Sequence, residues 1–227
     1  MPAASRSILA AASTAGALAL MASSAHAAEI KTLPCVPLLP GEQTMPIVGS
    51  AFTPGGFVTV STNTAANPTP VTLTSSRVDP AGGFKALTAP PRFARFDDNL
   101  QSFNLIATDT TNPAAPIVAT MPFQVVRFGM TRSPNPRRPT SRVTHTARGW
   151  TPGKRVYAHY RFGGKTRSTV SLGVAKGPCG ITSKKMRALP TAIRRGTWRA
   201  AIDQSKRYSK STRPQFVDSF RIFRTFG

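Results

Sequence analysis

The sequence predicts an all-β protein with two antiparallel β-sandwich domains in tandem, following a cleaved signal peptide. Three observations support this: an export signal at the N-terminus, apolar residues that alternate with polar ones along short segments, and one pattern that occurs twice. The alternation indicates half-buried strands, and Pro and Gly interrupt the chain at short intervals. A single large β-barrel is the alternative architecture.

Residues 1–27 have the features of a secretory signal. Arg6 precedes an uncharged run over residues 8–22, and Ala25-His26-Ala27 fits the small-x-small pattern of a cleavage site. The run is shorter than the ~20 apolar residues that span a bilayer. We therefore expect cleavage after Ala27, no transmembrane segment in the mature chain, and a secreted protein. Whether the protein also associates with the cell wall stays open at this point.

A duplicated pattern organises the rest of the chain. Three segments recur in the same order, at offsets of 98 (150 − 52), 95 (198 − 103) and 97 (220 − 123) residues: those beginning at Phe52 and Trp150, at Phe103 and Trp198, and at Phe123 and Phe220. We expect a Pro-rich lead-in over residues 28–45, a first domain over 46–129, a Pro- and Arg-rich linker over 130–141 and a second domain over 142–227. The alternative for the linker is an irregular edge strand of the second domain, which Pro tolerates.

The mature chain holds two cysteines, Cys35 and Cys179. Export leads to a compartment that permits disulfides. A bond between the two would close a loop of about 145 residues, worth roughly 5 kcal/mol by the chain-entropy model. Two unpaired thiols and an intermolecular link are the alternatives.

Charge divides the chain unequally. Residues 28–128 carry six Lys or Arg and six Asp or Glu, whereas residues 129–227 carry 23 basic and two acidic residues, a net charge of +21 (23 − 2). Drift in composition would have loaded both copies alike. Because self-repulsion at such a charge destabilises a compact domain, we expect a polyanionic partner to compensate it. Solubility or compositional drift is the alternative explanation.

Some of the basic residues are expected on one face of a strand over residues 155–162. Val156 and Ala158 would face the core if a three-residue loop with a bulge pairs them with Leu172 and Val170. A two-residue Gly-Gly turn would instead place arginine on the apolar side. With the first register, the predicted anion-binding residues are Arg155, Tyr157, His159, Arg161, Lys165, Arg167, Arg199 and Arg221.

The sequence offers little for catalysis or metal binding, so we expect no enzyme, no cofactor and no metal site. Asp203 and Asp218 are the carboxylates of the second domain, without the paired context that a glycosidase needs. His145 and His159 lack an acidic companion in sequence and are expected on strand surfaces. Cys179 lies in Gly-Pro-Cys-Gly, without the signature of a thiol enzyme. The aromatic residues are expected in the core rather than on a base-stacking platform: Trp150, Tyr160, Phe162 and Trp198.

The chain resembles Ig-like domains of secreted proteins from high-GC Gram-positive bacteria. The similarity lies in the two (Phe/Trp)-Thr-Pro-Gly segments and, in the second half, in Gly149-Trp150, Gly163-Gly164-Lys165, Gly177-Pro178-Cys179-Gly180 and Gly196-Thr197-Trp198. It covers most of residues 46–227. The resemblance implies Ig-like β-sandwich domains and export, and it brings no catalytic residues because such proteins are mostly uncharacterised.

Taken together, these features predict an exported, non-enzymatic binding protein whose basic second domain engages an anionic polymer of the cell envelope. The alternatives are a structural module for a protein partner, with incidental charge, and extracellular nucleic-acid binding. One contiguous basic patch would support a ligand site, whereas an even spread of cations would support solubility.

Overall fold

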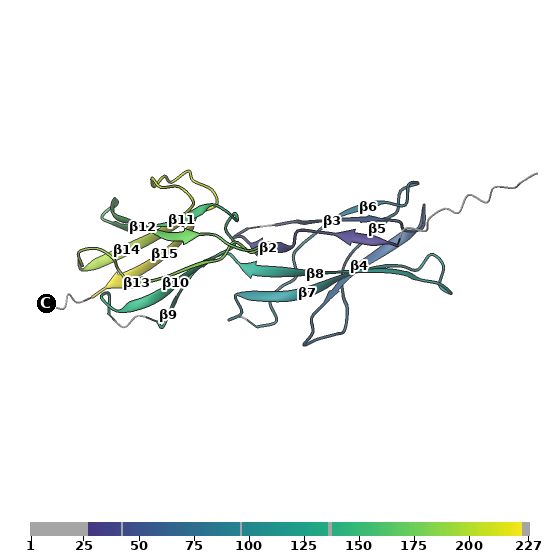
Figure 1. The fold of residues 1–227 in the computed structure, drawn as a ribbon, viewed down its shortest axis with the longest axis horizontal. Helices are drawn as coiled ribbons and strands as arrows, with labels where there is room; N and C mark the ends of the chain where they lie inside the picture. Colours follow the sequence, from purple (N-terminus) through teal and green to yellow (C-terminus); the bar gives the residue numbers. More distant parts are fainter. Residues whose placement is uncertain (1–26, 42, 96, 136–137, 224–227) are drawn as a thin grey trace, which may run out of the picture.

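The computed structural model describes residues 27–41, 43–95, 97–135 and 138–223, which form two β-sandwiches arranged end to end (Figure 1). The predicted all-β class with two Ig-like sandwiches in tandem is confirmed. Residues 1–26, which hold the predicted signal, lie outside the described part of the chain. No helix in the described ranges has the length and apolar character needed to cross a membrane.

The first sandwich packs a three-stranded sheet against a five-stranded one. The smaller sheet has the order β1 (Glu29–Lys31), β3 (Met45–Ser50) and β6 (Phe84–Thr88). The larger has the order β2 (Cys35–Leu38), β8 (Ile117–Arg127), β7 (Leu100–Asp109), β4 (Phe57–Asn63) and β5 (Val71–Arg77). All neighbours are antiparallel except β2 and β8, which pair in parallel.

The second sandwich repeats this plan. Its smaller sheet has the order β13 (Thr182–Arg187), β10 (Arg142–Arg148) and β9 (Gly129–Ser133). Its larger sheet has the order β12 (Lys165–Val174), β11 (Arg155–Phe162), β14 (Gly196–Asp203) and β15 (Phe216–Ile222). The order β8-β7-β4-β5 therefore corresponds to β15-β14-β11-β12, and the recurring segments of the sequence lie on or directly before matching strands.

Two predicted segment boundaries are wrong. The lead-in over residues 28–45 is part of the first sandwich, since it supplies β1 and β2 and reaches the start of β3. The linker over 130–141 begins as β9, which pairs with β10 from Gly129↔Arg148 to Ser133↔Thr144. Prolines did not prevent this strand because Pro134 follows its last paired residue, where no backbone N–H is needed.

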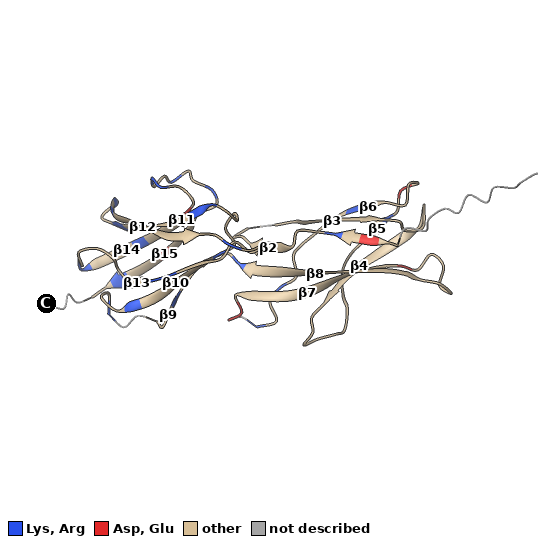
Figure 2. Ribbon diagram, in the orientation of Figure 1, with Lys and Arg blue, Asp and Glu red and all other residues tan. Residues whose placement is uncertain are grey.

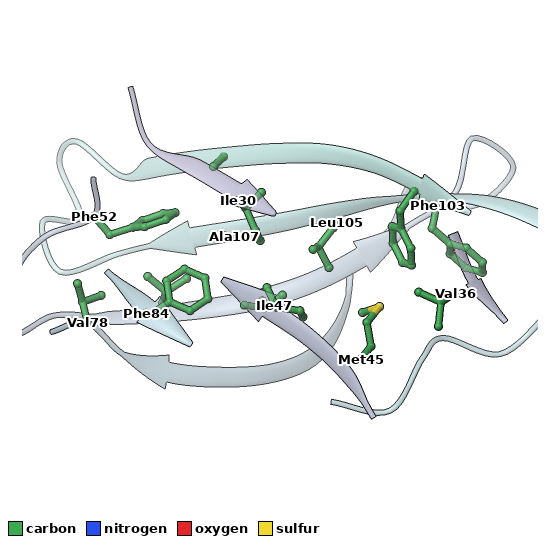
Figure 3. Packing of buried hydrophobic residues seen from close by; sticks show 14 of the residues in the cluster. Ile30, Val36, Met45, Ile47, Phe52, Val78, Phe84, Phe103, Leu105 and Ala107 are labelled. Carbon is green, nitrogen blue, oxygen red and sulfur yellow. The ribbon is translucent and has the colours of Figure 1, made fainter. Parts of the chain in front are cut away.

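Each sandwich has its own apolar core. In the first, alternate residues of the strands point inward, among them Leu105 and Ala107, which are fully buried (Figure 3). In the second, Trp150, Tyr160 and Trp198 are buried as predicted, whereas Phe162 is partly buried against the same cluster. Complete burial of one apolar side chain contributes about 1.5–3 kcal/mol, so each core stabilises its own domain substantially.

The junction between the sandwiches contains the predicted disulfide. Cys35 of β2 is bonded to Cys179, with 5.1 Å between their Cα atoms, and both pack with Val126 in a small apolar cluster. The backbone N–H of Phe128 also donates to the Leu38 carbonyl oxygen at 3.4 Å. The two domains are therefore joined covalently at a second point besides the direct passage of the chain from β8 to β9.

Candidate anion-binding site

On the larger sheet of the second sandwich, β11 has a buried side and a side that carries the predicted arginines. Along β11, Val156, Ala158 and Tyr160 are buried, while Arg155 is exposed and Arg161 is partly exposed on the opposite side. The alternation of the sequence thus places the arginines of this strand correctly.

The predicted register of this hairpin is partly wrong. Phe162 pairs directly with Lys165, so the turn contains two residues rather than three. The bulge is inside the ladder instead, at Tyr160/Arg161, and it restores the predicted pair of Ala158 with Val170. A second irregularity at Val156/Tyr157 pairs Val156 with Gly173. A bulge therefore sets the register that the sequence analysis expected from a three-residue loop.

His159 does not belong to an exposed face. It points to the predicted side of the sheet, yet none of it is exposed to solvent. Its Nε2 lies 3.2 Å from Asp203 Oδ1 and 3.1 Å from the Ser205 carbonyl oxygen, and both of these oxygens are acceptors. Its Nδ1 lies 3.0 Å from the Thr169 hydroxyl. The ring is thus a buried hydrogen-bonding group, so the prediction that His159 belongs to an exposed anion-binding face is wrong.

The loop over residues 204–215, between β14 and β15, covers His159. Asp203 holds the two ends of this loop: Oδ1 accepts from the Ser205 backbone N–H at 2.8 Å, and Oδ2 accepts from Gln215 Nε2 at 3.1 Å. Gln204 fixes its start through a bond from its Nε2 to the Thr151 carbonyl oxygen at 2.9 Å. A buried carboxylate with several donors is a strong local restraint, because each charge-assisted bond forms away from water.

Tyr208 ties the middle of the same loop to the sheet. The Arg161 guanidinium carbon lies 4.1 Å from the centre of the Tyr208 ring, and Nη1 donates to the Tyr208 hydroxyl at 2.9 Å. The ring also meets His159 edge-on, with 5.7 Å between centroids. Arg161 is therefore partly committed to holding the loop. The loop's own cations, Lys206, Arg207, Lys210 and Arg213, are exposed.

Sequence reasoning missed these four loop cations. They follow the strand within a run of Ser, Thr and Pro, and the signal that could have found them is the basic-aromatic sequence Lys206-Arg207-Tyr208. The period-two pattern gives no such information, since it describes strands and not the path of the chain between them.

The predicted residues on the strands do not all meet. Arg161 and Arg199 are directly opposite one another on β11 and β14, and Arg221 lies opposite Thr197 on β15. Lys165 and Arg167 are exposed at the start of β12, near the hairpin turn. Arg155 is six residues from Arg161 along β11, or about 20 Å. Tyr157 is partly exposed near Arg155, and these two are separated from the other residues by His159 and its loop.

Cations also occupy the smaller sheet. Arg142 of β10 is directly opposite Arg187 of β13, and Lys185 is two residues from Arg187 on the same strand. Figure 2 shows lysines and arginines on loops and strands on several sides of the second sandwich, and few on the first. The basic residues are therefore not confined to the single face that the sequence predicted. Like charges directly opposite each other destabilise a sheet, so both Arg–Arg pairs oppose folding.

Both carboxylates of the second domain are already engaged. Asp203 is buried as described above, and Asp218 pairs with Arg132, whose guanidinium carbon lies 4.9 Å from the centre of the Phe220 ring. The surface of this domain thus presents cations without available carboxylates in its described residues. That arrangement favours anions from outside the chain.

The other candidate groups are also accounted for. His145 was expected on a strand surface but is buried, and burial lowers its pKa to about 4 although its Nε2 is within 3.3 Å of the Arg187 carbonyl oxygen. Cys179 is consumed by the disulfide and offers no thiol. Within the described ranges, no three His, Cys, Asp or Glu side chains lie close enough together to hold a metal ion.

Comparisons with known proteins give a fold likeness and no family. No family model and no curated protein matches the chain. Among solved structures, a tetra-tandem repeat from the extending region of a large adhesion protein matches at 12% identity and a TM-score of 0.28, over 85% of this chain and 47% of that one, so the chain spans about half of its length. The Escherichia coli chaperone DraB matches at 10% identity and 0.35, over 85% and 98%. Trypsin-activated alpha-2-macroglobulin from Escherichia coli matches at 14% and 0.39, over 86% and 17%. These neighbours are all-β folds of the Ig-like, tandem-repeat and chaperone types.

Proposed function

We propose that this chain is an exported, non-enzymatic binding protein whose second sandwich engages an anionic polymer of the cell envelope. One observation carries the proposal: residues 129–227 hold 23 basic residues, while the two acidic ones, Asp203 and Asp218, are bound within the fold. Two directly opposed arginine pairs add to the repulsion. A polyanion relieves that repulsion, and it gains affinity by releasing its own counterions.

The first sandwich supports a different role. Its share of the sequence is neutral, and the disulfide fixes it to the basic domain. We assign it the part of a spacer or second interface. The resemblance to secreted bacterial proteins and the N-terminal signal support the exported location, and the nature of the polymer follows from charge alone.

The test uses the full mature chain on immobilised polyanions, with uncharged dextran as the control surface. We expect retention on inorganic polyphosphate and on heparin well above about 0.15 M salt, with an affinity that falls linearly with the logarithm of salt concentration. Elution below that salt would overturn the proposal. Tight, salt-insensitive capture of one protein would favour a protein-interaction module, and double-stranded DNA that outcompetes polymers of equal charge density would favour nucleic-acid binding.

A further inference from the structure

The loop over residues 204–215 differs in kind from its counterpart in the first sandwich. The equivalent connection, between β7 and β8, covers residues 110–116 and contains no charged residue, so it has seven residues against twelve. Both loops begin directly after a buried aspartate, Asp109 or Asp203. The two copies thus share the buried aspartate, here called the anchor, and differ in the length and charge of the loop that follows it.

The anchoring bonds have been redistributed between the copies. In the first sandwich, the backbone N–H of Thr53 donates to Asp109 Oδ2 at 2.9 Å. In the second, the corresponding N–H of Thr151 donates instead to Gln204 Oε1 at 3.2 Å. This leaves Asp203 able to accept from both ends of the longer loop, through Ser205 and Gln215.

The result is a loop whose backbone is restrained while its cations stay outside. Ser205, Tyr208 and Gln215 are each fixed to the body of the domain by the bonds described above. A second bond from Gln215 Nε2 reaches the Ser209 carbonyl oxygen at 3.1 Å and closes the loop on itself. Its exposed charges are Lys206, Arg207, Lys210 and Arg213, with no acidic residue among the twelve. Binding to a restrained loop costs less ordering entropy than binding to a flexible one.

We propose that the loop over residues 204–215 is the principal binding site of the second sandwich and that it binds the phosphate groups of a polymer. This inference rests on the function proposed above. A phosphate ester offers several acceptor oxygens, and the four exposed side chains supply guanidinium and ammonium donors within eight consecutive residues, 206–213. Tyr208 acts as a positioning residue, because it holds the loop through Arg161 and carries no charge itself.

The chain offers a matched control for this site. The loop variant replaces Lys206, Arg207, Lys210 and Arg213 with Gln. The control variant replaces Arg142, Lys184, Lys185 and Arg187, which lie on the two neighbouring strands of the smaller sheet. Each set removes two lysines and two arginines, so both variants lose the same net charge.

The measurement is the affinity of the full mature chain for inorganic polyphosphate, by fluorescence anisotropy over a range of salt concentrations. We expect the loop variant to lose at least about tenfold in affinity at about 0.15 M salt, and to lower the steepness of the log–log salt dependence by about 3, as four lost contacts require. We expect the control variant to change both much less. Tyr208→Ala should weaken binding several-fold with an unchanged salt dependence, since the number of cations is preserved. Tryptophan fluorescence melting verifies that each variant is folded.

Three failures can be told apart. If the wild-type chain binds no polyanion, the proposed function itself is wrong. If the wild type binds but the two fourfold variants lose affinity equally, binding depends on diffuse charge and the loop assignment is overturned. Equal affinity for poly-glutamate of matched charge would overturn the assignment to phosphate.

Discussion

The titration of His145 gives the sharpest quantitative test of the structure. This residue is fully buried in the second sandwich, and burial, together with the charge of nearby Arg132, lowers its pKa from 6.5 to about 4. The folded state therefore keeps the ring neutral over a range of pH in which the unfolded chain takes up a proton. Because the unfolded state binds more protons between pH 6.5 and pH 4, acidification through this window lowers the free energy of unfolding.

The magnitude follows from the size of the shift. Between pH 7 and pH 4 the linkage amounts to about 3 kcal/mol, of which about 1 kcal/mol is lost by pH 5.5. Below the folded-state pKa this group contributes only about 0.4 kcal/mol of further loss. Such a change is a large fraction of the stability of a typical domain.

The assay can isolate the second sandwich. The chain contains two tryptophans, Trp150 and Trp198, and both are buried in that domain. Urea unfolding followed by tryptophan fluorescence at pH 7, 5.5 and 4 therefore reports the second core. His145→Gln removes the titrating group, so its free energy of unfolding should fall by about 3 kcal/mol less than that of the wild type over this range. Parallel pH dependences for the two proteins would refute the reasoning.

Two further predictions concern the junction and the turn beside it. Gly180→Ala should be strongly destabilising, because a Cβ there would lie 1.6 Å from the Trp150 carbonyl oxygen. Gly177→Ala places its Cβ with no atom within 4 Å, so it should cost only the roughly 1 kcal/mol of its positive φ. Similar melting temperatures for the two variants would contradict this expectation. Replacing both cysteines, Cys35→Ser and Cys179→Ser, removes the disulfide and should lower the free energy of unfolding by up to about 5 kcal/mol. The measurement is urea unfolding of the double variant and of the wild type, with and without reductant. A wild type whose stability does not change with reductant would count against this stabilising role.

The fold could be predicted because its signals are local and occur twice. The alternation around Val58 on β4 reappears around Val156 on the matching strand β11. The alternation around Leu105 on β7 likewise reappears around Trp198 on β14. Neither periodicity nor turn chemistry could show that the larger sheets accommodate bulges within their ladders. The Gly163-Gly164 turn has its ordinary two-residue length, and the register is corrected further along the strands.

The site could be predicted only where the strands decide it. The outward direction of Arg155 and Arg161 follows from period two, and so does that of His159. The period-two pattern of a strand cannot predict that a loop from a distant part of the chain folds back over the middle of the sheet. This contact buries His159 and leaves Arg155 and Arg161 on either side of it. The correct local geometry therefore gave a wrong exposure.

The buried aspartates of the two copies, Asp109 and Asp203, connect the basic loop of the second sandwich to its fold. Both copies end a central strand with a buried aspartate, so this carboxylate belongs to the fold that the copies share and not to the basic loop alone. In the first copy the hydrogen bonds from Thr111 and Thr53 outweigh the effect of burial and hold the pKa of Asp109 at about 2, so the group serves the fold as a fixed anion. In the second copy Asp203 Oδ1 likewise accepts from the start of its loop, at Ser205, but Oδ2 accepts from Gln215 at the far end of the loop. A domain shaped only by drift toward arginine has no need to redirect its buried carboxylate in this way. The changed partner of this buried carboxylate therefore supports the proposed binding loop independently of the total charge.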